Sequence, residues 1–141
     1  MSDASLSESL HQLLHAYKRA LRQAYREADM ALTMSHMRTL KGVQRIPDCT
    51  AQAIASRTHR DKAQITRLIK DLLDAGLIAK QPHPDDRRSQ ILRLTVDGEH
   101  LVTQLRAVES TAATRMVKGL APDEIEHFVK LARLMAANLT H

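Results

Sequence analysis

The hydrophobic pattern of residues 50–94 constrains the fold most, because it changes from a helical period to a strand period within one short stretch. Thr50 and Asp61 are good N-caps for two successive helices, and Gly76 is suited to the left-handed conformation that ends the second. The expected elements here are helices over 51–57 and 61–76, then strands over 77–81 and 90–94. Two helices followed directly by a hairpin predict a winged helix-turn-helix.

Helical patterns flank this stretch on both sides. Apolar residues recur every three or four positions over 5–28, and Thr33 can cap a second helix over 33–44. Thr95 opens a fifth helix, and Pro122, at a favoured first position, opens a sixth. The predicted order is therefore α-α-α-α-β-β-α-α, a mainly α fold with a small β-hairpin wing.

With 141 residues the chain suits one compact domain. We expect residues 33–95 to form the winged lobe, and residues 1–32 and 97–141 to form dimerisation helices. Aromatic residues make up only 2% of the chain, and the terminal helices carry more Leu, Ala and Met surface than one small domain would bury. We therefore predict a homodimer, whose twofold axis would place two recognition helices about one DNA turn apart on a pseudo-palindromic site.

The net charge of +5 is concentrated in the middle of the chain. Residues 33–95 hold twelve Lys and Arg against six Asp and Glu, whereas the flanks hold nine and ten. A localised basic surface suits a nucleic-acid binder, because neutralising phosphates releases condensed counterions. A solvated face on a basic protein would give the same count, so charge alone leaves both interpretations open.

The helix over 61–75 is predicted to bury one face and display the other. On a helical wheel its Ile and Leu residues share one face, and Arg67 and Lys70 lie opposite. Arg67 is the best candidate for a bidentate contact with guanine, and Gln64 for one with adenine. An ordinary solvated helix face is the alternative interpretation. The residues expected to contact phosphates are Lys62, Thr66 and Lys70.

The turn between the two strands carries Asp86, Arg87 and Arg88. Arginines at such a tip can enter a minor groove, whose narrow stretches concentrate negative potential. Asp86 and Arg88 are two residues apart and would share one side of an extended loop, so we expect the carboxylate to hold the Arg88 guanidinium. The alternative is an exposed Asp-Arg pair that contributes little.

These motifs together resemble the MarR family of multiple antibiotic resistance regulators. The resemblance covers nearly the whole chain, and it implies a homodimeric repressor or activator. It also implies that Asp86 and Arg88 form the family's Asp-x-Arg wing element and that Arg67 faces the major groove. The runs that carry the resemblance are Asp61–Leu68, Gly76-Leu77-Ile78, Pro84–Arg88 and Leu94–Gly98.

Three methionines are candidates for a ligand pocket. Met30, Met34 and Met37 would line an adaptable apolar site between the first, second and fifth helices. The resemblance places a small aromatic effector there. Plain core packing is the alternative interpretation of methionines at helical spacing.

Other reactive residues indicate no further chemistry. Cys49 is expected to be a small loop residue whose pKa the neighbouring Asp48 raises, with an oxidation sensor as the alternative. His11 and His15 are four residues apart and supply only two ligands, too few for a metal site. No nucleophile-base grouping or phosphate loop appears, so we expect neither an enzyme nor a cofactor.

The polar N-terminus and the absence of an apolar run near ~18 residues predict a cytoplasmic protein without a membrane partner. The favoured function is a sequence-specific, double-stranded-DNA-binding transcription regulator. It would be a homodimeric, ligand-responsive repressor at a pseudo-palindromic operator. The alternative is a winged-helix protein-interaction module without sequence-specific DNA binding.

Overall fold

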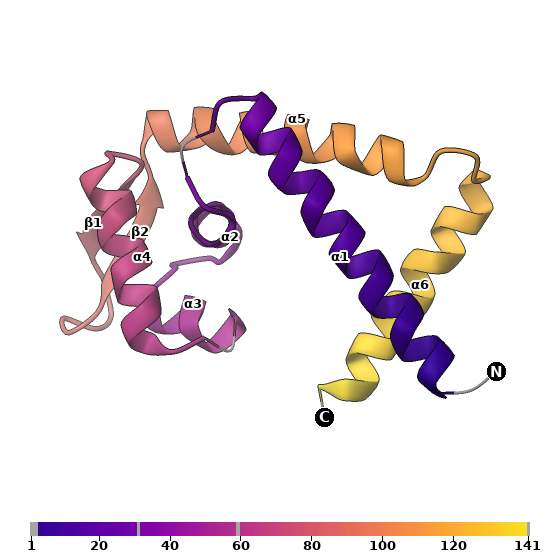
Figure 1. Cartoon of the computed structure of the whole chain (residues 1–141). Coiled ribbons are helices and arrows are strands. Elements are labelled where there is room, and N and C mark those ends of the chain that lie inside the picture. Colours follow the sequence, from indigo (N-terminus) through magenta and orange to yellow (C-terminus); the bar gives the residue numbers. More distant parts are fainter. Residues whose placement is uncertain (1–2, 31, 59, 141) are drawn as a thin grey trace.

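The computed structural model describes residues 3–30, 32–58 and 60–140 (Figure 1). Its element order confirms the predicted α-α-α-α-β-β-α-α arrangement of a mainly α fold with one hairpin. In chain order the elements are α1 (Asp3–Glu27), α2 (Met34–Arg45), α3 (Ala51–Thr58), α4 (Lys62–Asp74), β1 (Ile78–Pro82), β2 (Gln90–Leu94), α5 (Val96–Met116) and α6 (Pro122–Leu139).

The elements form a compact lobe and an extended frame (Figure 1). Helices α2, α3 and α4 and the hairpin make up the lobe, and α5 runs out of it directly after β2. The C-terminal part of α1 packs against α5, and α1 then diverges from α5 towards α6 (Figure 1). Helix α6 turns back so that its Phe128 lines the same groove as Leu13 of α1. The frame thus carries the lobe at one end of α5.

Side-chain caps begin four of the helices, at the positions that the sequence predicts. Each cap satisfies a main-chain amide that the first helical turn leaves without a partner, and such a cap contributes about 1 kcal/mol. In each pair the side-chain oxygen of the first residue accepts from the main-chain N–H of the second, at the N···O distance given: Thr33 and His36 (3.2 Å), Thr50 and Ala53 (3.1 Å), Asp61 and Ala63 (3.5 Å), Thr95 and Gly98 (3.1 Å).

Helix α4 ends in a Schellman motif. Gly76 has a φ of 73° and donates its N–H to the Leu73 carbonyl at 3.0 Å. The N–H of Leu77 donates to the Leu72 carbonyl, also at 3.0 Å. Because Leu77 still belongs to this cap, β1 covers Ile78–Pro82 and is shifted by one residue from the predicted strand.

The hairpin is antiparallel, with Ile78 opposite Leu94 and Pro82 opposite Gln90. Its buried side chains pack onto the lobe, and the N–H of Leu92 donates to the Cys49 carbonyl at 2.7 Å. This bond ties β2 to the loop between α2 and α3. The wing is therefore held by its apolar side chains and by the main chain.

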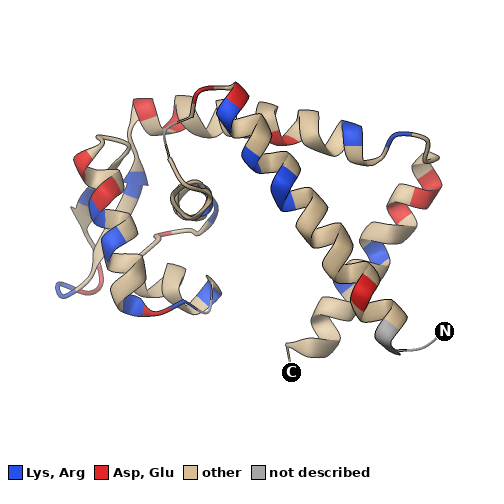
Figure 2. Ribbon diagram, in the orientation of Figure 1, with Lys and Arg blue, Asp and Glu red and all other residues tan. Residues whose placement is uncertain are grey.

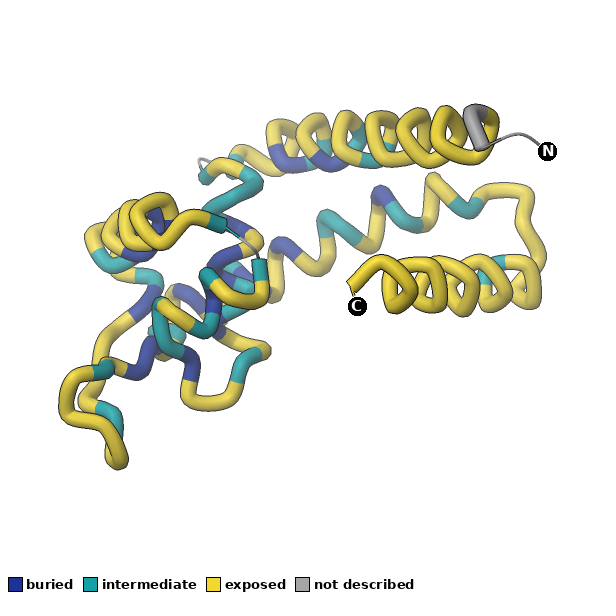
Figure 3. Tube along the Cα trace, turned by 90° about the horizontal axis from the view of Figure 1, so that it is seen from below, coloured by how far each residue is buried: buried dark blue, intermediate teal, exposed yellow. Residues whose placement is uncertain are grey.

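One cluster of buried side chains joins the lobe to the frame. Leu40 and Ile65 lie at its centre in the lobe, and Leu105 of α5 and Tyr25 of α1 continue it into the frame. Helix α6 contributes no buried residue. Figure 3 shows the exposed surface continuing along α6 and the N-terminal half of α1. The core is thus complete around the lobe and stops short of the far end of the frame.

Candidate nucleic-acid interface

Helix α4 buries one face and exposes the other, as the helical-wheel positions of its residues predict. Its apolar face packs into the core, with Leu72 fully buried and Leu73 half-buried. Because the apolar face is anchored, the opposite face stays fixed relative to the wing. The polar residues that it exposes include all five predicted DNA contacts of the helix: Lys62, Gln64, Thr66, Arg67 and Lys70.

A cleft of about 570 Å³ lies between α4, the start of α3 and the hairpin. It brings together five of the eight predicted contact residues, and Lys80 of β1 adds a fifth cation. Among the residues that the structure describes, no Asp or Glu lines the cleft, so its concave surface concentrates positive potential of the kind that attracts phosphates. The predicted residues that line it are Lys62, Thr66, Lys70, Arg87 and Arg88.

Five polar or charged residues that line the cleft were not predicted as contacts: Thr50, Gln52, Lys80, Ser89 and Gln90. The sequence marks Thr50 only as a helix cap, and Lys80 only as one charge among many. Lys80 pairs with Leu92 in the hairpin register, and both residues line the cleft. Strand alternation next to a basic turn is the signal that would have identified Lys80.

Gln64 and Arg67 lie outside this cleft, on another exposed part of α4. Figure 2 shows Lys and Arg along α4 and at the tip of the hairpin loop. Among the described residues no acidic side chain forms an ion pair with Arg67. Its guanidinium therefore keeps all its donors for another partner.

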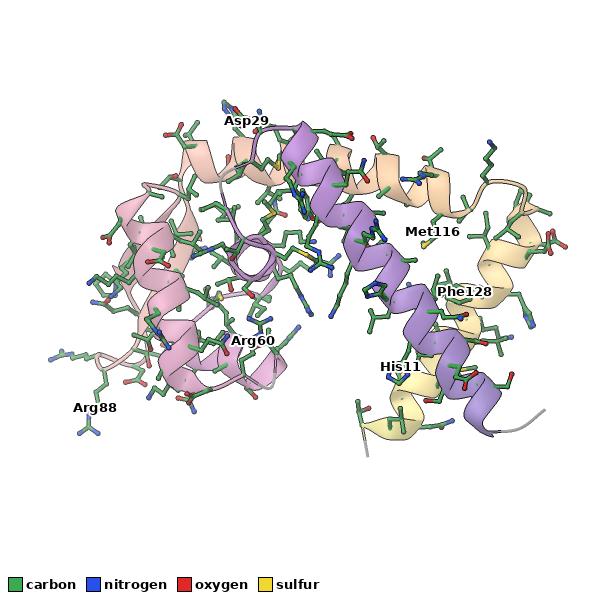
Figure 4. The ribbon with its side chains drawn as sticks, viewed as in Figure 1. His11, Asp29, Arg60, Arg88, Met116 and Phe128 are labelled. Carbon is green, nitrogen blue, oxygen red and sulfur yellow. The ribbon has the colours of Figure 1, made fainter. Side chains whose placement is uncertain are left out.

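At the wing tip, Asp86 binds the main chain and a neighbouring hydroxyl. Its Oδ1 accepts from the main-chain N–H of Arg88 at 3.0 Å, and its Oδ2 accepts from the Ser89 hydroxyl at 3.0 Å. These two bonds hold the pKa of Asp86 below its usual range. The prediction that Asp86 holds the Arg88 guanidinium is wrong, because the tight turn brings the main-chain amide to the carboxylate first. Figure 4 shows the Arg88 side chain projecting from the tip.

A polar network joins α1, α2 and α5 where the frame meets the lobe. Glu109 Oε1 accepts from the Tyr25 hydroxyl at 2.9 Å and from Lys41 Nζ at 2.5 Å. Burial, followed by the Glu109 hydrogen bond, raises the pKa of Tyr25 well above its usual range. The tyrosine therefore stays a hydrogen-bond donor, and the frame and lobe are tied together by one carboxylate.

Cys49 is a core residue, only 1% exposed. Burial raises the pKa of its thiol to about 11, although Arg57 partly offsets that shift. The predicted direction is confirmed, but the cause is desolvation and not the charge of Asp48. The thiol is therefore protonated and shielded.

We expect Cys49 to react with a thiol-specific disulfide reagent at least about a hundredfold more slowly in the native protein than in urea, because both the thiolate fraction and access are reduced. The release of the reagent's chromophore at about pH 8 measures both rates. Equal rates in the two conditions would contradict the burial of this side chain.

The three methionines that were expected to line a ligand pocket pack in or against the core. Met37 is buried, and Met30 and Met34 are half-buried against the same cluster. The methionines therefore have the plain core packing that was the alternative interpretation. The ligand pocket stays a prediction.

Among the described residues, no three His, Cys, Asp or Glu side chains gather in a way that would hold a metal ion, and His11 has Ser7 as its hydrogen-bond neighbour. Within the same residues, no helix combines the length and the apolar character needed to cross a membrane.

Residues 32–90 match the model of the MarR family. The fold is similar to that of BpsR from Bordetella bronchiseptica, in a structure that concerns regulation of its DNA binding by 6-hydroxynicotinic acid (25% identity, TM-score 0.78, 92% of this chain and 91% of that chain). It is similar to a mutant of MarR from E. coli complexed with operator DNA, with 19% identity and a TM-score of 0.79 over 93% of each chain. RV1404 from Mycobacterium tuberculosis is also similar, with 21% identity and a TM-score of 0.79 over 100% of this chain and 96% of that chain.

The family match covers the lobe that holds α4 and the basic cleft, and the structural likeness extends over the frame. Residues 32–90 therefore form a domain of the MarR family of DNA-binding transcription regulators, and the rest of the chain continues the fold of the similar structures.

Proposed function

We propose that the protein binds a specific double-stranded DNA site with α4 in the major groove and the wing in the adjacent minor groove. The basic cleft between α4 and the hairpin, which five described cations and no described acidic residue line, carries this proposal. Lys62, Thr66 and Lys70 hold phosphates, Gln64 and Arg67 read base edges, and Asp86 shapes the turn that presents Arg87 and Arg88.

We propose that two copies bind together at a pseudo-palindromic operator. Apolar side chains of α1 and α6 are exposed in the single chain, where Leu10 and Phe128 are 61% and 52% exposed. A second copy would cover this surface, and the twofold axis would set the spacing of the two α4 helices. MarR-family regulators are DNA-binding proteins without catalytic activity, and we propose the same for this chain.

The contact assignment is tested with Arg67→Ala and Arg88→Ala. Each is expected to weaken binding to the DNA upstream of the protein's own gene about tenfold or more, because each removes one charged contact per half-site. Fluorescence anisotropy with that DNA and with a scrambled duplex measures the affinities. Arg67→Ala should reduce the preference between the two duplexes, and Arg88→Ala should also flatten the dependence on salt.

Arg133→Ala on α6 is the matched control, since it removes the same group from an exposed position on the frame. Unchanged affinity in both lobe variants would contradict the assignment of α4 and the wing. Binding of every duplex with equal affinity, combined with binding to an acidic protein partner, would favour the protein-interaction alternative.

We also propose that a small aromatic effector weakens DNA binding, so that the protein is a ligand-responsive repressor. Regulation of DNA binding in BpsR by 6-hydroxynicotinic acid supports an aromatic acid as the class of ligand. In this chain the Tyr25, Lys41 and Glu109 network joins frame and lobe, so a ligand that changes this junction changes the spacing of the α4 helices. Footprinting upstream of the gene with 6-hydroxynicotinic acid or 4-hydroxybenzoic acid, together with a transcriptional reporter, tests both statements.

A further inference from the structure

His36, in the first turn of α2, joins two helices through its two ring nitrogens. Nδ1 lies 3.3 Å from the main-chain nitrogen of Thr33 and 2.6 Å from the Thr33 hydroxyl. Nε2 lies 2.8 Å from Oδ2 of Asp71 on α4. The His36 side chain is 15% exposed and that of Asp71 is 58% exposed, so a shielded imidazole holds a surface carboxylate.

The partners of His36 determine which nitrogen carries the proton. The Thr33 amide can only donate, so Nδ1 accepts from it and Nε2 donates to Asp71. The ring therefore acts as a rigid spacer with an acceptor at one end and a donor at the other. Since Thr33 caps α2 directly after the connection from α1, the contact links α4 to the start of α2.

Asp71 lies four residues beyond Arg67 on the same helix, a spacing at which opposite charges commonly pair. Such a pair would occupy the guanidinium that is proposed to read a base. Among the described residues the side chain of Asp71 is hydrogen-bonded to His36, and no ion pair joins it to Arg67. The histidine thus removes a competing acceptor from the reading face of α4.

A second contact from the same turn of α2 holds the start of α4. Arg60 donates from Nη1 to the Ser35 hydroxyl at 2.9 Å, immediately before Asp61, the N-cap of α4. Figure 4 shows Arg60 in the lobe near this end of α4. Ser35 thus holds the residue before the N-cap of α4, and His36 holds Asp71 near the other end of α4, so a rotation of α4 on α2 would disturb these contacts.

We propose that His36 is a positioning residue for DNA recognition: through Asp71 it sets the rotation of α4 on α2 and leaves Arg67 free for base edges. The inference rests on the proposed function, because it assumes that α4 reads DNA. It assigns to α2 a part in sequence discrimination although α2 contributes no proposed DNA contact.

The test separates the Asp71 contact from the helix cap. His36→Glu keeps the cap, since a glutamate at the equivalent position of α6, Glu124, accepts from the Ala121 amide at 2.9 Å, but it places a carboxylate against Asp71. His36→Gln keeps both contacts, because an amide offers one acceptor and donors. The double variant His36→Glu with Asp71→Asn restores a donor for the new carboxylate and has the wild-type net charge.

The readout is the ratio of affinities for the footprinted site and for a scrambled duplex of the same length. His36→Glu is expected to reduce this ratio about tenfold or more, whereas His36→Gln and the double variant stay within about twofold of wild type. Asp71→Asn alone gives the effect of charge, and circular dichroism in urea reports the stability of each variant. A cap-only role predicts an unchanged ratio for His36→Glu.

An unchanged ratio in His36→Glu, or a double variant that does not recover, would overturn the positioning role while leaving the proposed function in place. A wild-type protein without preference for any duplex would instead overturn the proposed function, and this inference with it.

Discussion

Replacing Gly98 with alanine is expected to lower the free energy of unfolding by about 3 kcal/mol. A Cβ at this position would clash with the Leu77 carbonyl oxygen, a contact with main chain that no side-chain rotation relieves. That carbonyl is also fixed, because it accepts from the Thr95 N–H at 3.1 Å. The start of α5 would therefore have to move away from the end of α4.

Urea unfolding followed by circular dichroism, at one protein concentration, measures this effect. Gly42→Ala is the matched control, because nothing lies within 4 Å of a Cβ at that position in α2. It is expected to leave stability unchanged or to raise it by about 0.5–1 kcal/mol, since alanine favours a helix interior. Equal midpoints for the two variants would contradict the close approach of α5 to Leu77.

The local signals of the sequence were sufficient for most of the fold. Caps such as Thr50 and Asp61 and the glycine at 76 each act within a few residues, so their patterns are visible in the chain itself. The one-residue shift of β1 has the same local cause, since the cap of α4 includes Leu77. The role of Gly98 was not visible, because the carbonyl that it approaches belongs to another element.

The candidate site was predicted in part for a similar reason. Residues on one helix or one turn, such as Lys62 and Arg88, were found from charge and helical spacing, and the fold brings them to one cleft. The contact of His36 with Asp71 spans 35 positions, and that of Tyr25 with Glu109 spans 84. No period in the sequence reports such pairs, because tertiary packing alone brings them together.

Replacing Phe128 with glutamate is expected to convert the proposed dimer to a monomer and to weaken operator binding at least about a hundredfold. Phe128 lines a groove to which α1, α5 and α6 all contribute, together with Leu10, Leu13, Leu14, Tyr17 and Met116. Figure 4 shows Phe128 on α6 with Met116 on α5 above it. A carboxylate there would be buried without a partner in the dimer. Because each of the two copies carries the substitution, the free-energy penalty for burying the charge occurs twice.

Sedimentation equilibrium gives the mass of the variant, and anisotropy gives its affinity for the footprinted site. Ala137→Glu is the matched control: it adds the same charge to α6 nine residues away, on the opposite side of the helix. Since Phe128 lies outside the buried cluster of the lobe, the lobe should stay folded and still bind DNA weakly. A dimeric variant with full affinity would show that α6 does not form the interface.

The size of the expected loss follows from the two-site geometry. One lobe offers its α4 and its wing to a single half-site, and its affinity depends on phosphate contacts that scrambled DNA also supplies. In the dimer, binding of the first lobe places the second at a high local concentration over the other half-site, so the contacts of both lobes act together. A monomeric variant should therefore lose the preference for two half-sites at a fixed spacing while it retains the salt-dependent binding of each lobe.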